Sequence, residues 1–184
     1  MRIATSPAFL ASIVNDPRVR PWLVQDTDPA ELSIDALFAQ GIGLEFDTGG
    51  WFLHRLGDGV YEVHTLFLPG SRDVLGKTRE AMAAIFCGTD CLRLVTKVPA
   101  DNKAADRLTR YAGFRLDYVR EAAFLRGGIR HDVRHYSLGL DDFVRERGIR
   151  WFRDECIALG EPDKGQRAAV RWAVVHDDYA ALEN

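Results

Sequence analysis

The chain has 184 residues, of which 47% are hydrophobic and 28% charged, with a net charge of −3. This balance excludes a disordered chain and predicts one globular domain without a nucleic-acid-binding surface. No apolar run is long enough to cross a bilayer, and the N-terminus lacks the apolar stretch of a secretory signal, so we expect a cytoplasmic protein.

The first third of the chain predicts two short helices followed by antiparallel strands. Helically spaced apolar residues follow Pro7, and Asn15-Asp16-Pro17 ends that helix because the residue before proline avoids helical angles. A second short helix is expected within 29–38. Short β-rich runs follow at 41–46, 51–55 and 60–68, separated by the turn signals 47–50 and 57–59.

Residues 60 to 114 predict a strand–helix–strand–helix unit. The strand 60–68 stops at Pro69, and the turn 69–73 opens a helix that runs to about Phe86. A second strand, 92–98, stops at Pro99, and Asp101-Asn102 caps a helix that ends at Gly113-Phe114. A strand that leads into a helix N-terminus presents free backbone N–H groups, which favour a phosphate. The unit therefore suits a ligand that carries a pyrophosphate.

Two segments of this unit resemble the GNAT acyltransferases, which transfer an acyl group from acyl-coenzyme A to an amine. The segment 66–72, LFLPGSR, resembles the family's approach to its pyrophosphate loop. The segment 98–105, VPADNKAA, with YAGF at 111–114, resembles its N-x-x-A…G-F segment. The resemblance covers roughly residues 1–143. It implies an α/β fold with a mixed sheet of about six to seven strands flanked by helices, and acetyl-CoA or another acyl-CoA as cofactor.

The resemblance also implies where the cofactor lies. In GNAT folds two central strands splay apart, and the pantetheine pairs with free backbone groups like an added strand. In this chain Thr65 to Leu68 would supply that backbone. The cofactor-binding residues implied are Leu66, Phe67, Leu68, Arg72, Asp73, Val74, Gly76, Lys77 and Asn102.

The pyrophosphate loop departs from the family pattern. Counting from Arg72, the two positions that usually hold glycine or alanine hold Leu75 and Lys77, and Gly76 is one place out of register. Glycine is needed where backbone approaches a phosphate closely. This departure supports an alternative function, a GNAT-fold protein without catalysis that serves as a binding or structural subunit. The sequence also resembles GNAT-like proteins of tailed phages and prophages, which suggests a virion or assembly role.

Two residues on the first strand of the unit are the candidate general base. Glu62 and His64 lie two apart, hence on one face of the strand, and could relay a proton through water. His54 is on the neighbouring hairpin strand, and the register of the two strands decides whether it lies alongside. The alternative is a cross-strand polar pair without a catalytic role.

The general acid of the family is a tyrosine four residues before the helix-ending glycine. That position holds Thr109, whereas Tyr111 lies two residues before Gly113. Tyr111 is the candidate catalytic acid, although two helical positions turn it by about 200°. The alternative is a buried Tyr111 that packs on the sheet. The acceptor, a small-molecule or protein amine, is not identified by the sequence.

The segments 118–126 and 133–140 predict two further strands, joined by a loop at 127–132. His131 and His135 in this region are four apart, but the surroundings indicate turn and strand and no third ligand is evident. We therefore expect no metal. The three cysteines, Cys87, Cys91 and Cys156, fit no zinc spacing and are expected to be buried, reduced thiols.

Residues 144–184 are expected to form a helical extension beyond the 1–143 domain. Asp141-Asp142 begins a helix that reaches Gly160, residues 161–166 form a linker, and a second helix spans 168–179. This hairpin either packs on its own domain or docks on a partner protein. Trp151, Trp172 and Tyr179 are the natural anchors for docking, since aromatic residues dominate interface hot spots.

Overall fold

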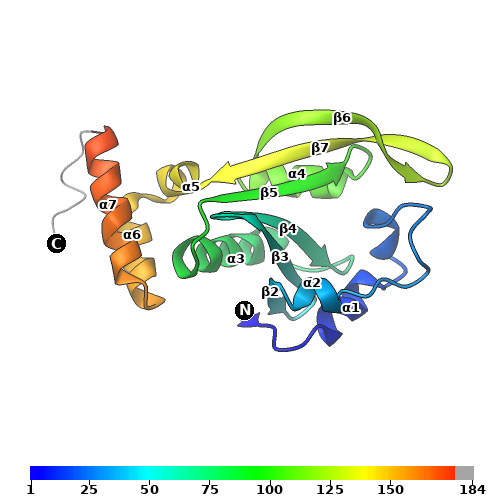
Figure 1. Cartoon of the computed structure of the whole chain (residues 1–184), viewed down its shortest axis with the longest axis horizontal. Coiled ribbons are helices and arrows are strands. Elements are labelled where there is room, and N and C mark those ends of the chain that lie inside the picture. Colours follow the sequence, from blue (N-terminus) through cyan, green and yellow to red (C-terminus); the bar gives the residue numbers. More distant parts are fainter. Residues whose placement is uncertain (177–184) are drawn as a thin grey trace.

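The computed structural model describes residues 1–176 and contains a seven-stranded sheet with helices on both faces (Figure 1). The strands are β1 (Arg2–Ile3), β2 (Gly41–Phe46), β3 (Gly49–Gly57), β4 (Val60–Phe67), β5 (Arg93–Pro99), β6 (Arg115–Arg126) and β7 (Ile129–Gly139). The helices are α1 (Ala8–Val14), the 3₁₀ turn η1 (Arg20–Trp22), α2 (Asp35–Phe38), α3 (Val74–Gly88), α4 (Lys103–Tyr111), α5 (Leu140–Arg147), α6 (Ile149–Ala158) and α7 (Pro162–His176).

The strand order is β1-β2-β3-β4-β5-β7-β6. All neighbouring strands are antiparallel except β4 and β5, which are parallel because α3 crosses between them. The predicted α/β class, the strand number and the helices on both faces are confirmed. The tilted end of the sheet at β6 and β7 extends well beyond the helices as a long hairpin (Figure 1).

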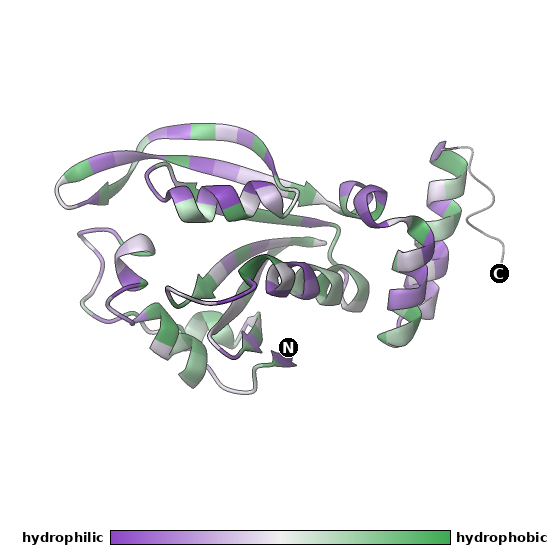
Figure 2. Ribbon diagram, turned by 180° about the vertical axis from the view of Figure 1, so that it is seen from behind, coloured by the Kyte–Doolittle hydropathy of each residue, from purple (hydrophilic) through white to green (hydrophobic). Residues whose placement is uncertain are grey.

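Each face of the sheet has its own apolar cluster. Alternate residues of β3 and β4, such as Trp51, Leu53 and Val63, pack with α3 residues, including Met82 and Phe86. The remaining alternate residues of β3 and β4 point to the other face, where they form a second cluster that α1 and α2 cover. The apolar colouring of α1 and α3 in Figure 2 follows from this packing. The two clusters hold β4 rigidly from both sides, which matters for the site on its C-terminal half.

Two glycine-dependent turns differ from the sequence-based expectation. The loop expected at 127–132 is a two-residue turn, Gly127-Gly128, with φ of 58° and 72°. Both positive φ values suit the hairpin turn that matches strand twist. Residues 129–132 therefore belong to β7. The expected helix from Asp141 to Gly160 is two helices, because Gly148 breaks it with a φ of 92°.

The C-terminal helices pack on the sheet domain. Phe143 of α5 stacks on Phe86 of α3 at 4.7 Å between ring centroids, and Phe152 of α6 is fully buried in the same cluster. The expected linker at 161–166 is wrong, since α7 begins at Pro162, where proline suits the first helical turn. Trp151 and Trp172 are partly buried against the core, and Tyr179 lies outside the described residues.

The cysteines are buried and free, as predicted. Burial raises the pKa of the Cys91 thiol to about 12 and raises the pKa of Cys156, so both stay protonated near neutral pH. These thiols act as small apolar groups of the core. Across residues 1–176, no helix has the length and apolar character needed to traverse a bilayer.

Candidate active site

The central strands β4 and β5 separate halfway along their length. They pair only at Val60↔Arg93, Tyr61↔Leu94 and Glu62↔Val95, although both strands continue further. Beyond this point β4 remains paired with β3, and β5 with β7. One side-chain bond bridges the start of the gap, where Thr96 Oγ1 donates to the Val63 carbonyl at 3.0 Å. The predicted divergence of the two strands is confirmed, and the β4 edge facing β5 has no strand partner.

A cavity of about 650 Å³ fills this gap. Its walls come from the C-terminal halves of both strands, the loop after β4, the start of α4 and the segment around η1. The lining residues include His64, Phe67, Lys97, Asn102 and Thr109. This volume lies within the range of about 300–1,000 Å³ that is usual for small-molecule and cofactor sites.

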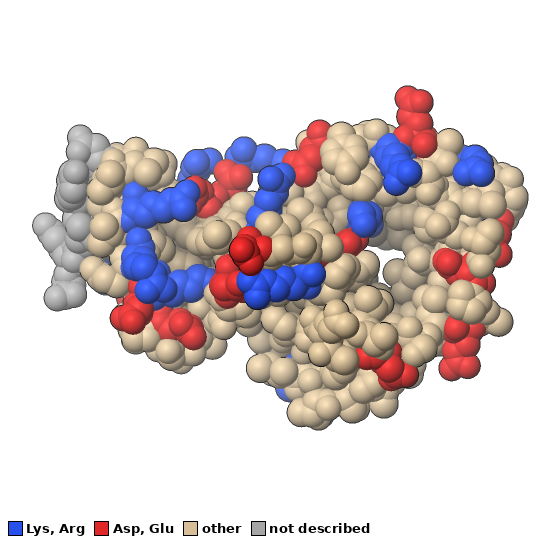
Figure 3. Space-filling model, in the orientation of Figure 1, with Lys and Arg blue, Asp and Glu red and all other residues tan. Residues whose placement is uncertain are grey.

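The tip of the β6–β7 hairpin contacts the segment 22–26, whose first residues line the cavity. Asp26 accepts hydrogen bonds from the backbone N–H groups of Gly127 and Gly128, each at 2.8 Å. Gln25 accepts another from the backbone N–H of Leu125 at 3.1 Å, and the Arg126 guanidinium stacks over Trp22 at 4.5 Å. The hairpin tip and the segment 22–26 are thus joined, and together with β4 and β5 they form a closed ring of chain segments. Figure 3 shows the opening that this ring encloses.

The loop after β4 places a protein carboxylate at the start of α3. Asp73 adopts a left-handed conformation with φ of 50°, and its Oδ1 accepts a hydrogen bond from the backbone N–H of Gly76 at 3.1 Å. The side chain thus caps the helix, although the backbone angles differ from the extended ones usual for an N-cap residue. This hydrogen bond also means that the Gly76 N–H, expected to face a phosphate, already has an anionic partner.

The other residues of the implied pyrophosphate loop are spread around it. Val74 lines the cavity, and Arg72, which follows the lining residue Ser71, is exposed. Lys77 forms an ion pair with Asp47 and lies 3.4 Å from Thr48 Oγ1, on the β2–β3 turn. That ion pair lowers the pKa of Asp47. Of the backbone positions proposed for the pantetheine, Phe67 and Leu68 line the cavity, whereas Leu66 is buried against α1.

Asn102 stands at the start of α4 and lines the cavity. Its Oδ1 accepts a hydrogen bond from the backbone N–H of Ala105 at 3.1 Å, so it caps its helix. Its side-chain NH₂ group is not used by the cap. Capping and contact with a ligand in the cavity are therefore compatible.

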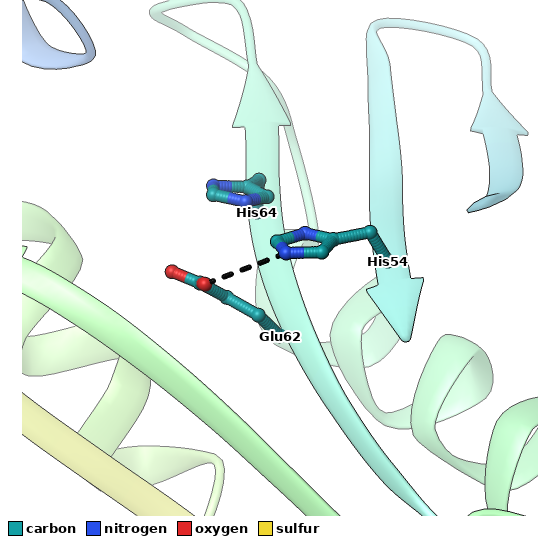
Figure 4. Close-up of side chains that lie close together, drawn as sticks. All are labelled: His54, Glu62 and His64. Atoms are coloured by element: carbon teal, nitrogen blue, oxygen red, sulfur yellow. Dashed lines mark ion pairs between the residues drawn. The ribbon is translucent and has the colours of Figure 1, made fainter. Parts of the chain in front are cut away.

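A polar cluster lies on the α1 side of β3 and β4 (Figure 4). His54 stands directly across from Glu62 in the strand register, and its Nε2 lies 3.8 Å from a Glu62 carboxylate oxygen. The His54 and His64 rings stack at 5.9 Å with an interplanar angle of 11°. The structure thus brings Glu62, His64 and His54 together, and His64 faces the cavity.

Lys97, which sequence reasoning missed, completes the cluster from β5. Its Nζ lies 3.0 and 3.1 Å from the two carboxylate oxygens of Glu62. Burial lowers the pKa of His64, and the nearby Glu62 charge opposes that effect only in part. His64 is therefore neutral near pH 7 and able to accept a proton.

The cluster also has the composition of a metal site. One ligand atom from each of His54, Glu62 and His64 lies within 4.8 Å of the others. Both oxygens of the carboxylate already contact the Lys97 ammonium, which a cation would have to displace. We assign no metal to it. His131, considered as a metal ligand from the sequence, instead lies 3.4 Å from Asp101.

Tyr111 does not reach the cavity. Its side chain is 65% exposed, and the face of α4 that lines the cavity carries Ala105, Leu108 and Thr109. The helical turn of about 200° between positions 109 and 111 explains this. Both expectations for Tyr111 are corrected: it is neither placed as a catalytic acid nor buried on the sheet. No tyrosine among residues 1–176 lines the cavity.

Comparison with solved structures identifies the architecture. A spermidine N-acetyltransferase from Vibrio cholerae, crystallised with CoA and spermine, matches with a TM-score of 0.64 and 13% identity, over 78% of this chain and 97% of that one. A protein described as a probable acetyltransferase matches with a TM-score of 0.55 and 19% identity, over 71% and 85% of the two chains. The chain has the GNAT fold. No protein-family model matches the sequence, and no curated protein matches it.

The GNAT fold accounts for most of the chain but does not by itself assign an activity. The divergent β4–β5 pair and the cavity between them determine which groups of this chain can contact a ligand.

Proposed function

We propose that this protein is an acyl-CoA-dependent N-acyltransferase. The observation that carries the proposal is the unpaired edge of β4 beside a cavity that also contains His64 and Asn102. An extended pantetheine chain can add to such an edge through backbone hydrogen bonds. The similar Vibrio cholerae structure was crystallised with CoA, which supports the same class of cofactor here.

In the proposed reaction the amine nitrogen attacks the thioester carbonyl, the C–N bond forms and the C–S bond breaks. His64 accepts the proton that the amine loses, directly or through a water. The thiolate of CoA leaves and takes up a proton from solvent, because Tyr111 points away. Neutral His64 is the group best suited to this step near neutral pH. The His54 ring stacks on the His64 ring, and the Glu62 charge favours the protonated form of His64 that arises in this step.

The cofactor arm of this proposal is tested by thermal unfolding. Ligand at ten times its Kd adds about 1.4 kcal/mol of stability, which for a chain of this size raises Tm by about 3–6 °C. We expect acetyl-CoA at millimolar concentration to give such a rise. Arg72→Glu, a change at an exposed residue next to the lining residue Ser71, should abolish the rise while leaving the Tm of the free protein unchanged. An undiminished rise in this variant would place the pyrophosphate elsewhere.

The pH dependence of transfer follows from His64. Because burial lowers its pKa below the ordinary value of 6.5, the neutral base persists as the pH falls through 6.5. We expect kcat/KM on the acidic side to decline only below that pH, where His64 becomes protonated. An acidic limb centred above pH 6.5 that does not follow the pKa of the acceptor amine would mean that another group of the protein is the base.

A second function is favoured by one specific observation, the Asp73 carboxylate at the start of α3. A loop whose anion site is filled by its own side chain suits a GNAT-fold protein that binds or scaffolds without catalysis. A virion or assembly subunit of a phage, suggested by sequence, belongs to this alternative. Absence of any stabilisation by acetyl-CoA would support it over the transferase.

Asp73→Gly separates the two functions. Glycine accepts the φ of 50° that Asp73 adopts, and replacing an aspartate cap with glycine costs only a few tenths of a kcal/mol, roughly. If the loop binds the pyrophosphate, removal of the competing carboxylate should lower the Kd for acetyl-CoA several-fold, as titration calorimetry would show. An unchanged or weaker affinity would argue that α3 does not face the phosphates.

A further inference from the structure

The cavity carries more positive than negative side chains. Arg18, Lys97 and Lys103 line it, whereas the only carboxylate among its lining residues in the described chain is Asp101. Asp101 is already engaged by the Arg126 guanidinium and lies 3.4 Å from His131. A polycation would find little unpaired negative charge here, so the chemistry differs from that needed to bind spermine.

Lys97 lies at the border between the buried cluster and the cavity. Its side chain is 53% exposed, whereas that of Glu62, its partner, is 6% exposed. An ammonium has three N–H donors, and the two contacts to Glu62 leave one of them for a ligand. A ligand carboxylate would make a charge-assisted hydrogen bond with it.

His64 and Lys97 lie level with each other across the gap. Glu62 pairs with Val95, and each of the two side chains is two residues further along its strand, on the same face of the sheet. Paired strands are about 4.8 Å apart, and the divergence of β4 and β5 widens this spacing. The two side chains therefore present a proton acceptor and a cation a few ångströms apart.

The size of the cavity limits the acceptor. Backbone N–H groups of the β6–β7 hairpin tip donate hydrogen bonds to Asp26 and Gln25, which follow the lining residues Trp22 and Leu23. A cavity of about 650 Å³, shared with the acyl end of the cofactor, suits a small-molecule acceptor.

Resting on the transferase function proposed above, we propose that the acceptor is a small amino acid-like molecule, in which the amine stands next to a carboxylate. The amine lies at His64, and the carboxylate lies at Lys97. The amine and the carboxylate of the acceptor then match the His64 imidazole and the Lys97 ammonium, which lie on opposite sides of the gap. Lys97 acts as the residue that selects for the carboxylate.

The test is an acetylation assay with matched acceptors, each pair being an amino acid and the amine obtained by removing its carboxylate. The pairs are phenylalanine with phenethylamine and alanine with ethylamine. Spermidine is the third acceptor. We expect a preference of about tenfold or more in kcat/KM for the amino acid of a pair, in line with a hydrogen bond between charged groups. Lys97→Gln should remove the preference by raising KM for the amino acid alone, and Lys97→Arg should keep it.

Arg93→Gln is the matched control. Arg93 lies on the same strand and face as Lys97 but bonds Asp117 and Ser137, away from the cavity. It should leave the preference intact. Preference for the decarboxylated amine or for spermidine, or an equal loss for both members of a pair in Lys97→Gln, would overturn the inference. Those outcomes leave transfer itself intact, whereas failure of acetyl-CoA to raise Tm contradicts the proposed function.

Discussion

Replacing His64 with glutamine is expected to lower kcat by about 10²–10⁴-fold, the usual contribution of a positioned general base. His64 lines the cavity and is kept neutral by burial, whereas the neighbouring Glu62 is tied to Lys97. Glutamine keeps a polar side chain of similar length but cannot accept the proton. Single-turnover acetylation with a saturating acceptor measures the effect on the chemical step.

His135→Gln is the control for this variant. His135 lies on the same face of the sheet, on β7, and stacks on Tyr118 at 4.2 Å outside the cavity. It should retain wild-type kcat. The His64→Gln protein should still be stabilised by acetyl-CoA, because the cofactor edge of β4 is unchanged. A kcat within a factor of about three of wild type would remove His64 from the reaction.

Replacing Phe152 with alanine is expected to destabilise the whole domain by about 3–5 kcal/mol, as large-to-small changes in cores do. Phe152 belongs to α6, yet it is fully buried in the same cluster as Phe86 of α3. If the C-terminal helices folded independently of the sheet, the loss of stability would be confined to those helices. Urea unfolding, followed both by total fluorescence and by a probe on β4, measures it.

Ile157→Ala on the same helix is the matched control, because Ile157 is 54% exposed. Surface changes of this kind stay within about 0.5 kcal/mol. Two separated unfolding transitions, with only the weaker one shifted by Phe152→Ala, would contradict the shared core. A single shifted transition would confirm that the extension and the sheet unfold together.

Local sequence signals were sufficient for the central unit of the fold. Pro69 and Pro99 stop their strands, and Asn102 caps α4 as the sequence indicated. The two-residue spacing of Glu62 and His64 placed them on one face, which the structure shows. Each of these signals depends only on neighbours within a few residues, so the sequence was sufficient to predict the structure at these positions.

The parts of the site that were missed depend on contacts between distant segments. The pairing of His54 with Glu62 needs the register of β3 on β4, and the Lys97–Glu62 ion pair needs two strands that are 35 residues apart. The ring around the cavity joins Gln25 to Leu125 across 100 residues. One signal for Lys97 was available in the sequence: it follows Val95 by two residues, so the two side chains lie on the same face of β5.

The hydrogen bond between the Asp73 side chain and the N–H of Gly76 in its own helix could not be predicted from the sequence either. The sequence marks Asp73 as an acidic residue in an expected phosphate loop, which indicates weak binding. Whether its carboxylate points to solvent or to Gly76 depends on a left-handed backbone that the surrounding loop imposes. That detail decides between the two functions proposed above.

Amide hydrogen exchange, with and without saturating acetyl-CoA, tests the central claim most directly. If a pantetheine adds to the free edge of β4, amides within residues 64–68 and at the start of α4 should exchange more slowly with the cofactor present. Amides of the β6–β7 hairpin stem and of α7 should be unaffected. Unchanged exchange in residues 64–68, or protection confined to other segments, would contradict an acyl-CoA site between the two strands.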